Sequence, residues 1–415
     1  MPLIEHVIGR RVWDSRGWPA VEAEVVASNG VTGRAIAPSA SSSHPAGMWE
    51  LRDGGAAFEG LGVTRAVAGI AGDIAQALTG LDVRDQDTID RRLIALDGTP
   101  DKSRLGANAI LAVSMAVAEA GAKAADLALW EYLARGKVPG CFPSPVVDLF
   151  SGGDAGTEHG GPDFNSIRLA PVEAPDFATG LEWARETMRA ATMLLKGADS
   201  AVGLSEMGGL AVRFETADEA LALGVRAIER AGLQPGEDLA LILDIGANRF
   251  GRGGRYLIAR EAVTLPTGQM IQRALGLLRR YPITGLIDPL AQDDLAGVVH
   301  LTEAAGSNVS IIGGDVLISN TARIAAAAKI AAFNAVELRL TDCGTLTELR
   351  ESVAAARTAG FEVGLRAEAG FGTSGALAHV ALGLGAGTLA PGGLARGERI
   401  AVWNEALRLA GQPAS

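Results

Sequence analysis

The sequence predicts a two-domain α/β protein, in which a small α+β domain precedes a closed barrel of alternating strands and helices. The chain has 415 residues, more than a single hydrophobic core of roughly 250–300 residues accommodates. Hydrophobic residues make up 48% of it and charged residues 20%, as expected for a folded chain with large cores. Beyond a Pro-Gly linker at residues 137–140, short apolar runs alternate with longer helical ones, which is the pattern of a parallel sheet.

Residues 1–136 are expected to form the smaller, N-terminal domain. The runs Val21–Val25 and Val31–Ala37 flank a Ser-Asn-Gly turn signal, so they predict a β-hairpin. The polar stretch 38–47 has no periodicity and predicts a mobile surface loop. Apolar residues recur at helical spacing over Ala66–Leu78 and Gly106–Leu129, which predicts two helices.

Residues 140–415 are expected to form the barrel, because at least six strand–helix units favour closure over an open sheet. Catalytic groups would then lie at the C-terminal ends of the strands. The predicted strands are Leu239–Leu243, Ile283–Ile287, Ser310–Ile312, Ala335–Leu340, Glu362–Arg366 and Thr388–Leu389. The predicted helices between them are Ala217–Ala231, Thr267–Arg280, Thr321–Ala332 and Leu346–Ala359.

Charge and hydropathy exclude several classes of function. The net charge of −11 argues against nucleic acid or an anionic membrane as a partner, since both require basic patches. It leaves room for a small anionic substrate held by one or two local arginines. The first 16 residues contain no apolar leader, and no stretch approaches 18 uninterrupted apolar residues. We therefore expect a soluble, cytoplasmic protein.

Several motifs, in the same order along the chain, resemble the enolase family and together span nearly the whole sequence. They are Asp14-Ser15-Arg16-Gly17, Glu50-Leu51-Arg52-Asp53-Gly54, Gly98-Thr99-Pro100-Asp101-Lys102-Ser103, Gly106-Ala107-Asn108-Ala109-Ile110-Leu111, Tyr281-Pro282-Ile283, Asp288-Pro289, Asp293-Asp294, Cys343-Gly344-Thr345-Leu346 and Ala395-Arg396-Gly397-Glu398-Arg399. The resemblance implies an enolase fold: an N-terminal α+β capping domain, a modified (β/α)8 TIM-type barrel with an irregular first turn, and a homodimer.

The resemblance also implies three metal-binding carboxylates at successive strand ends, and this chain keeps only one. Asp244 matches the first, but Ile287 and Gly314 fall at the second and third. Asp288 and Asp315 match neighbouring acids, so hydrogen bonding around the barrel rim is the favoured interpretation of both. One aligned carboxylate does not hold Mg²⁺, so no metal is expected. The alternative is a rebuilt Mg²⁺ site formed by Asp244, Asp288 and Asp315.

The catalytic positions implied by the family change as well. The base lysine falls at Arg339, which stays protonated at neutral pH and is suited instead to clamping a carboxylate or phosphate. The acid glutamate falls at Met207, with Glu206 one position earlier. The family's His-x-Gly-Gly motif is written here with Glu158 and His159, and His159 would act as the proton carrier.

The substrate-binding positions follow the same trend. The phosphate-binding His-Arg-Ser run falls at residues 367–369, which brings Glu368 into the cleft, and Arg366 stands directly before it. Ser42 aligns with the first-loop serine of the family. Because scaffold motifs are kept while metal, base, acid and phosphate positions change together, the cleft is interpreted as one retuned for a different ligand.

Three functions remain open on this basis. The first is a divergent lyase or isomerase that acts on a small anion by acid–base chemistry without Mg²⁺, with His159, Glu206, Asp244 and Arg339 as catalytic candidates. The second is a catalytically inactive pseudo-enolase that binds or regulates. A lesser alternative is an enzyme similar to carboxyphosphonoenolpyruvate synthase. For Arg339, anion binding and a permanent ion pair with Asp244 are both open. Authentic enolase activity is disfavoured, since loss of one general acid or base typically costs about 10²–10⁴-fold in rate.

Overall fold

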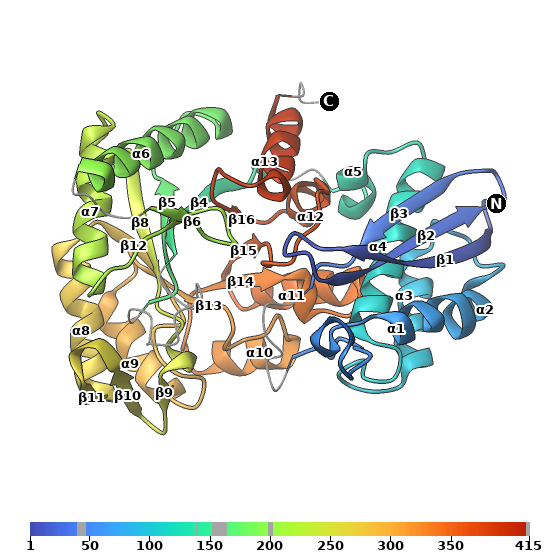
Figure 1. The fold of residues 1–415 in the computed structure, drawn as a ribbon, viewed down its shortest axis with the longest axis horizontal. Helices are drawn as coiled ribbons and strands as arrows, with labels where there is room; N and C mark the ends of the chain where they lie inside the picture. The colour runs from blue at the N-terminus through green and yellow to red at the C-terminus, as the bar shows by residue number, and fades with distance from the viewer. Residues whose placement is uncertain (40–46, 138–139, 152–163, 198–201, 412–415) are drawn as a thin grey trace.

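The computed structural model describes residues 1–39, 47–137, 140–151, 164–197 and 202–411. Within them the chain forms two compact parts, an N-terminal domain at the right of Figure 1 and a larger barrel domain at its left. The last helix of the first part ends at Ala134, and the first strand of the second begins at Ser144. We propose that the boundary between the domains falls in this interval, near residues 136–140.

The N-terminal domain is a three-stranded antiparallel sheet covered by helices on one side. Its strands are β1 (Ile4–Trp13), β2 (Pro19–Ala27) and β3 (Thr32–Ile36). Its helices are α1 (Thr64–Gly69), the π-helical turn η2 (Ile70–Ile74), α2 (Ala75–Leu78), α3 (Gln86–Asp97), α4 (Ala107–Ala124) and α5 (Leu129–Ala134). The pairing of β2 with β3 confirms the predicted hairpin, and β1 adds a strand that the sequence had not indicated.

The helix predicted over Gly106–Leu129 ends five residues early, at Ala124. Asp126 takes a left-handed conformation with φ 57°, and the N–H of Leu127 donates to the carbonyl of Ala122. This is the hydrogen-bond pattern that closes helices at a left-handed residue. Helix α4 is apolar on nearly every side and lies against the sheet so closely that a Cβ at Gly33 would meet the carbonyl oxygen of Ala116 at 2.1 Å.

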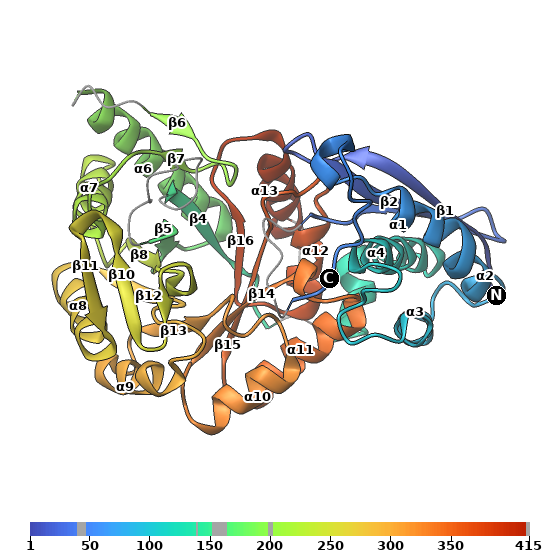
Figure 2. The same cartoon turned by 60° about the horizontal axis from the view of Figure 1, so that its bottom comes forward.

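Eight strands of the described chain close into a barrel, which confirms the predicted fold class (Figure 2). Strand β16 pairs with β4 to close it, and β5 runs antiparallel to both of its neighbours, so the first turn of the barrel is irregular. The strands are β4 (Ser144–Ser151), β5 (Ser166–Pro171), β8 (Leu239–Asp244), β12 (Ile283–Ile287), β13 (Ser310–Gly313), β14 (Ala335–Arg339), β15 (Glu362–Arg366) and β16 (Thr388–Gly392).

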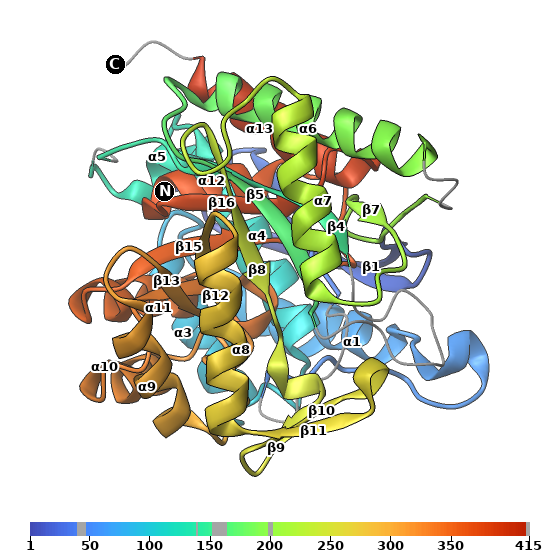
Figure 3. The same ribbon diagram turned by 90° about the vertical axis from the view of Figure 1, so that its left-hand side faces the viewer.

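Helices surround the barrel, and Figure 3 shows α6 to α10 along its outer face. They are α6 (Phe177–Gly197), α7 (Ala217–Arg230), α8 (Thr267–Arg280), α9 (Leu295–Ala305), α10 (Thr321–Lys329), α11 (Leu346–Thr358), α12 (Ala376–Leu384) and α13 (Gly397–Ala410). Small additional strands are β6 (Gly203–Leu204), β7 (Leu210–Ala211), β9 (Gly251–Arg252), β10 (Arg255–Ile258) and β11 (Val263–Pro266). Among the described helices none is long and apolar enough to cross a membrane.

The N-terminal domain touches the barrel at the end where β15 finishes. The hydroxyl of Ser15 donates to the carbonyl of Ala369 over 2.8 Å, and the N–H of Ser39 donates to the carbonyl of Gly370 over 3.0 Å. Since parallel barrel strands carry their functional groups at their C-terminal ends, these contacts place the smaller domain as a cap over the functional end of the barrel.

Candidate functional site

The strand ends beneath the cap carry an unusual density of charge. Asp244 ends β8, and Arg339 and Arg366 end β14 and β15. Asp315 and Glu368 each lie two residues beyond the end of their strand. Because these strands are parallel, their C-terminal ends meet at one rim. The sequence-predicted residues Asp244, Arg339, Arg366, Asp315 and Glu368 are therefore brought together.

A residue that the sequence analysis did not single out, Arg168, occupies the interior of this site. It projects from β5 and lies 2.6 Å from Glu337, 3.0 Å from Asp244 and 3.2 Å from Asp148. All four side chains are buried. Burial alone would lower the pKa of Arg168, but the three carboxylates outweigh it and raise the pKa above its ordinary value.

Arg339 does not pair with Asp244, contrary to one of the two interpretations of this residue. Its guanidinium forks onto the carboxylate of Asp342 at 2.8 and 2.9 Å, and it lies 2.7 Å from Asp315 and 3.1 Å from Glu368. Strands β13 and β12 separate β14 from β8, while Asp342 follows Arg339 after one tight turn. Arg339 pairs with Asp342 because Asp342 is only three residues away along the chain. Asp244 pairs instead with Arg168.

Arg366 joins the two halves of the site. Its guanidinium lies 3.2 Å from Asp315, 3.6 Å from Glu337 and 3.7 Å from Asp244. The result is one charged network within the described residues. Its members are the three arginines Arg168, Arg339 and Arg366 and the six carboxylates Asp148, Asp244, Asp315, Glu337, Asp342 and Glu368.

Asp288 is a structural hydrogen-bond acceptor, as one interpretation of the sequence held. It follows β12 in a left-handed conformation with φ 44°, and its carboxylate accepts the N–H groups of Gly314 and Asp315 at 2.9 and 2.6 Å. Burial and the nearby charge of Asp315 raise its pKa above the ordinary value. Asp288 therefore organises the turn that carries Asp315.

The residues present do not fit the divalent-metal site that the resemblance implies. Asp244 already accepts from Asn165 at 3.1 Å through one oxygen and from Arg168 at 3.0 Å through the other. Ile287 and Gly314 offer no side-chain ligand at the other two positions. In the described part of the chain, no group of three or more His, Cys, Asp or Glu side chains is arranged to hold a metal ion.

Glu206 does not join this network. Glu206 lies exposed on the turn between β6 and β7, and its backbone carbonyl accepts a hydrogen bond from Arg399 at 3.4 Å. Ser42, Glu158 and His159 lie outside the described residues, as does most of the predicted polar loop. Their roles stay predictions.

Four members of the network were missed by sequence reasoning: Arg168, Asp148, Glu337 and Asp342. A signal did exist for two of them. Arg168 and Glu337 each stand inside otherwise apolar strand runs, where a charged residue is almost never buried unless it is paired. Period two places Glu337 on the same face of β14 as Arg339. The ion pairs of Arg168 join residues of different strands, so the spacing of residues along the chain does not predict them.

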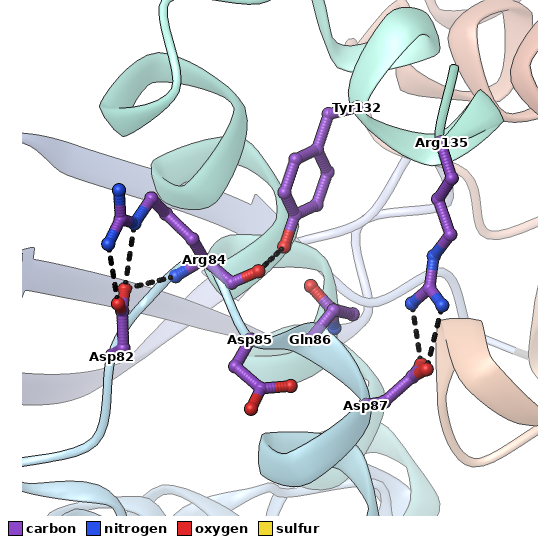
Figure 4. A pocket seen from close by; sticks show the side chains of 7 residues that line it. All are labelled: Asp82, Arg84, Asp85, Gln86, Asp87, Tyr132 and Arg135. Carbon is purple, nitrogen blue, oxygen red and sulfur yellow. Dashed lines mark hydrogen bonds and ion pairs between the residues drawn. The ribbon is translucent and has the colours of Figure 1, made fainter.

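A separate cavity of about 530 Å³ lies in the capping domain, away from these strand ends (Figure 4). Its two arginines are already paired: Arg84 with Asp82, and Arg135 with Asp87 at 2.6 and 2.7 Å. Tyr132 closes one side and donates its hydroxyl to the carbonyl of Arg84. The cavity therefore presents no free arginine to an anion.

A capped α/β barrel with its charged groups at the strand ends defines a class of barrel proteins in which a separate domain covers the functional end. Comparison with known proteins identifies the family. Residues 4–133 match the family model "Enolase, N-terminal domain", and residues 140–414 match "Enolase, C-terminal TIM barrel domain". A relative described as "Enolase", from Acidothermus cellulolyticus, is 39% identical over 409 residues, which cover 99% of this chain and 94% of that protein. The chain belongs to the enolase family.

Proposed function

We propose that this chain is a divergent lyase or isomerase of the enolase family that acts on a small anionic substrate by acid–base chemistry, without the family's usual Mg²⁺ site. The observation that carries this proposal is the pair of guanidinium groups of Arg339 and Arg366. They stand on neighbouring residues of β14 and β15 in register, at the capped end of the barrel. Two guanidinium groups side by side suit bidentate capture of a carboxylate.

In this proposal, different residues of the site bind the anion, exchange a proton with it and orient the arginines. Arg339 and Arg366 hold the anionic group and stabilise negative charge that develops on it. Asp315 is 35% exposed and contacts both arginines, so it is the carboxylate best placed to exchange a proton with a bound ligand. Arg168 and its buried partners fix the orientation of Arg366 from below. Glu206 and His159 stay candidate acid–base groups.

Dehydration of 2-phosphoglycerate is not expected. The family's acid, base and two of its three metal-ligand positions are occupied here by Met207, Arg339, Ile287 and Gly314. Purified protein with Mg²⁺ and 2-phosphoglycerate should show no rate above a mock purification. A rate that Asp244→Ala abolishes would contradict the proposal and restore the family's reaction.

A second candidate is a binding protein without turnover. One observation favours it: within the described residues, each of the six carboxylates of the network is engaged by an arginine within 3.8 Å. A strongly paired carboxylate is a weak proton acceptor. Ligands that bind without being converted during long incubation would favour this candidate over the enzyme.

The anion site is tested by Arg366→Gln. In a thermal-shift titration with L-malate and L-lactate, wild-type protein should be stabilised, and the variant should lose that response, because one of its two guanidinium groups is gone. Arg189→Gln on helix α6, where the exposed side chain bonds to Glu186 and Met193 of the same helix, removes the same charge and should leave the response unchanged. An unchanged response in Arg366→Gln would place the anion elsewhere.

A further inference from the structure

The two arginines of the proposed anion site share one carboxylate in this structure. A single oxygen of Asp315 lies 2.7 Å from Nη1 of Arg339 and 3.2 Å from Nη2 of Arg366. Asp315 is also the most exposed member of the network at 35%, whereas Arg366 reaches 17% and Glu368 only 6%. Asp315 therefore occupies the solvent side of the guanidinium pair, where the carboxylate of a ligand would arrive.

The charges of the network do not balance. Three guanidinium groups meet six carboxylates, so negative charge is in excess among the described residues. The neighbouring Arg399 does not correct this, because it brings its own partner Glu398 at 3.8 Å. Uncompensated buried charge is costly, so a further positive charge would stabilise the described residues of the network.

Three buried atoms of the network also lack hydrogen-bond partners among the described residues. They are Oε1 of Glu368 and Oε2 of Glu337, both acceptors, and Nε of Arg366, a donor. Glu368 is more than nine-tenths buried and lies 3.1 Å from Nε of Arg339, without the geometry of a hydrogen bond. Nε of Arg366 and Oε2 of Glu337 face each other at 3.6 Å, so Oε1 of Glu368 is the buried acceptor that a donor group of a ligand would satisfy.

We propose that the ligand of this site is a zwitterion, a small amino-carboxylate, whose carboxylate replaces that of Asp315 on Arg339 and Arg366 and whose ammonium group is held by the displaced Asp315 and by Glu368. The inference rests on the proposed function, because it names the substrate class of the same anion site. Exchange of one carboxylate for another keeps the charge-assisted bonds of both arginines. The ammonium group then supplies the positive charge that the network lacks.

A ligand carrying only negative charge fits less well. It would displace Asp315 and leave that carboxylate without its two guanidinium partners, which increases the local excess of negative charge. A phosphorylated acid would increase it further, and the residues at the end of β15 that would have to receive a phosphate are Ala367, Glu368 and Ala369. The preference of the site for an amino acid over a hydroxy acid should therefore depend on the ammonium group.

Matched pairs of ligands test this directly. L-alanine and L-aspartate differ from L-lactate and L-malate only in carrying an ammonium group in place of a hydroxyl. Isothermal titration calorimetry on the full-length protein should show each amino acid binding at least about tenfold more tightly than its hydroxy acid. Asp315→Asn should reduce this preference to about threefold or less and strengthen hydroxy-acid binding, because the competing carboxylate is gone. Glu186→Gln on the surface of α6 removes an equal charge and should change neither affinity.

The outcomes separate this inference from the proposed function. Equal binding of amino and hydroxy acids by wild-type protein, lost in Arg366→Gln, overturns the zwitterion and keeps the anion site. An unaltered amino-acid preference in folded Asp315→Asn also overturns it. If neither the amino acids nor the hydroxy acids bind wild-type protein at the highest ligand concentration of the titration, both proposals fall. Should Asp315→Asn not fold, the wild-type comparison alone decides.

Discussion

Arg168 pairs with three buried carboxylates in the interior of the barrel. Its guanidinium faces Asp148, Asp244 and Glu337 at 2.6 to 3.2 Å, with all four side chains almost inaccessible to water. Such a group is a poor source of net stability, because desolvation offsets most of the attraction. Removing the arginine alone is different, since it leaves three buried carboxylates beside one another.

Arg168→Met is therefore expected to lower the free energy of unfolding by about 3–5 kcal/mol at pH 7. Burial raises the pKa of both Asp148 and Asp244, so these carboxyls take up protons readily once Arg168 is gone, and the loss should shrink toward pH 5. Urea unfolding at both pH values measures it. Arg189→Met on the surface of α6 should change stability by less than about 0.5 kcal/mol. A loss that is the same at both pH values would contradict this account.

At the scale of elements, the N-terminal domain provides hydrogen-bond acceptors for the first turn of the barrel helix α11. The first N–H groups of α11 have no acceptor within the helix, and side chains of the N-terminal domain accept from two of them. The hydroxyl of Ser114 accepts from the N–H of Leu346 at 3.0 Å, and the carboxylate of Asp90 accepts from the N–H of Thr347 at 2.9 Å. Asp87 adds ion pairs to Arg135 of the capping domain and to Arg350 of α11. Through Asp87 and Asp90, helix α3 therefore binds the N-terminal domain to α11 of the barrel.

Asp90 makes this junction sensitive to pH. Burial raises its pKa to about 6, opposed by its hydrogen bonds. A carboxyl whose folded pKa exceeds its unfolded value contributes stability that is fully present below about pH 4 and is lost as the pH rises through about 6. The stability difference between wild type and Asp90→Asn should therefore shift by about 3 kcal/mol in favour of the variant between pH 4 and pH 7.

Chemical denaturation of both proteins at several pH values gives this difference. Asp126→Asn is a suitable control, because Asp126 is exposed, has a left-handed conformation that asparagine accepts, and lies beyond the end of α4, outside the α3–α11 junction. The opposite slope, with wild type gaining on Asp90→Asn as the pH rises, would show that Asp90 is held ionised in the folded protein.

At the scale of the whole molecule, the cap and the barrel are joined to each other by contacts of the opening motif. The opening motif at residues 14–17 is engaged within the chain: Arg16 pairs with Asp14 at 3.0 Å and Ser15 donates to Ala369 of the barrel. We propose that the intact two-domain chain forms a homodimer. Light scattering at micromolar concentration should give twice the monomer mass of 42.6 kDa. A mass near that of the monomer would contradict the proposal.

Local sequence was sufficient for much of the fold. The strands over Ile283–Ile287 and Glu362–Arg366 and the helix over Thr267–Arg280 have the bounds that their apolar patterns predicted. Strand and helix periods are set by neighbours along the chain, so a pattern of single residues specifies them. The same reasoning placed Asp244, Arg339 and Arg366 at strand ends, because parallel strands end at one rim.

The partners of those charged residues were decided only by the tertiary structure. An ion pair between Asp244 and Arg339 was one of two open interpretations, yet Asp244 contacts Arg168 of β5, an antiparallel strand that the strand prediction did not include. Arg339 instead contacts Asp342, Asp315 and Glu368. Ion pairs depend on separation in space, and inside a closed barrel residues from β4, β5, β8 and β14 converge across a distance that no spacing along the chain encodes. The sequence by itself placed Asp244, Asp315, Arg339, Arg366 and Glu368 at the strand ends. Closure of the barrel brought in Arg168, Asp148, Glu337 and Asp342 and determined which of these charges neutralise one another.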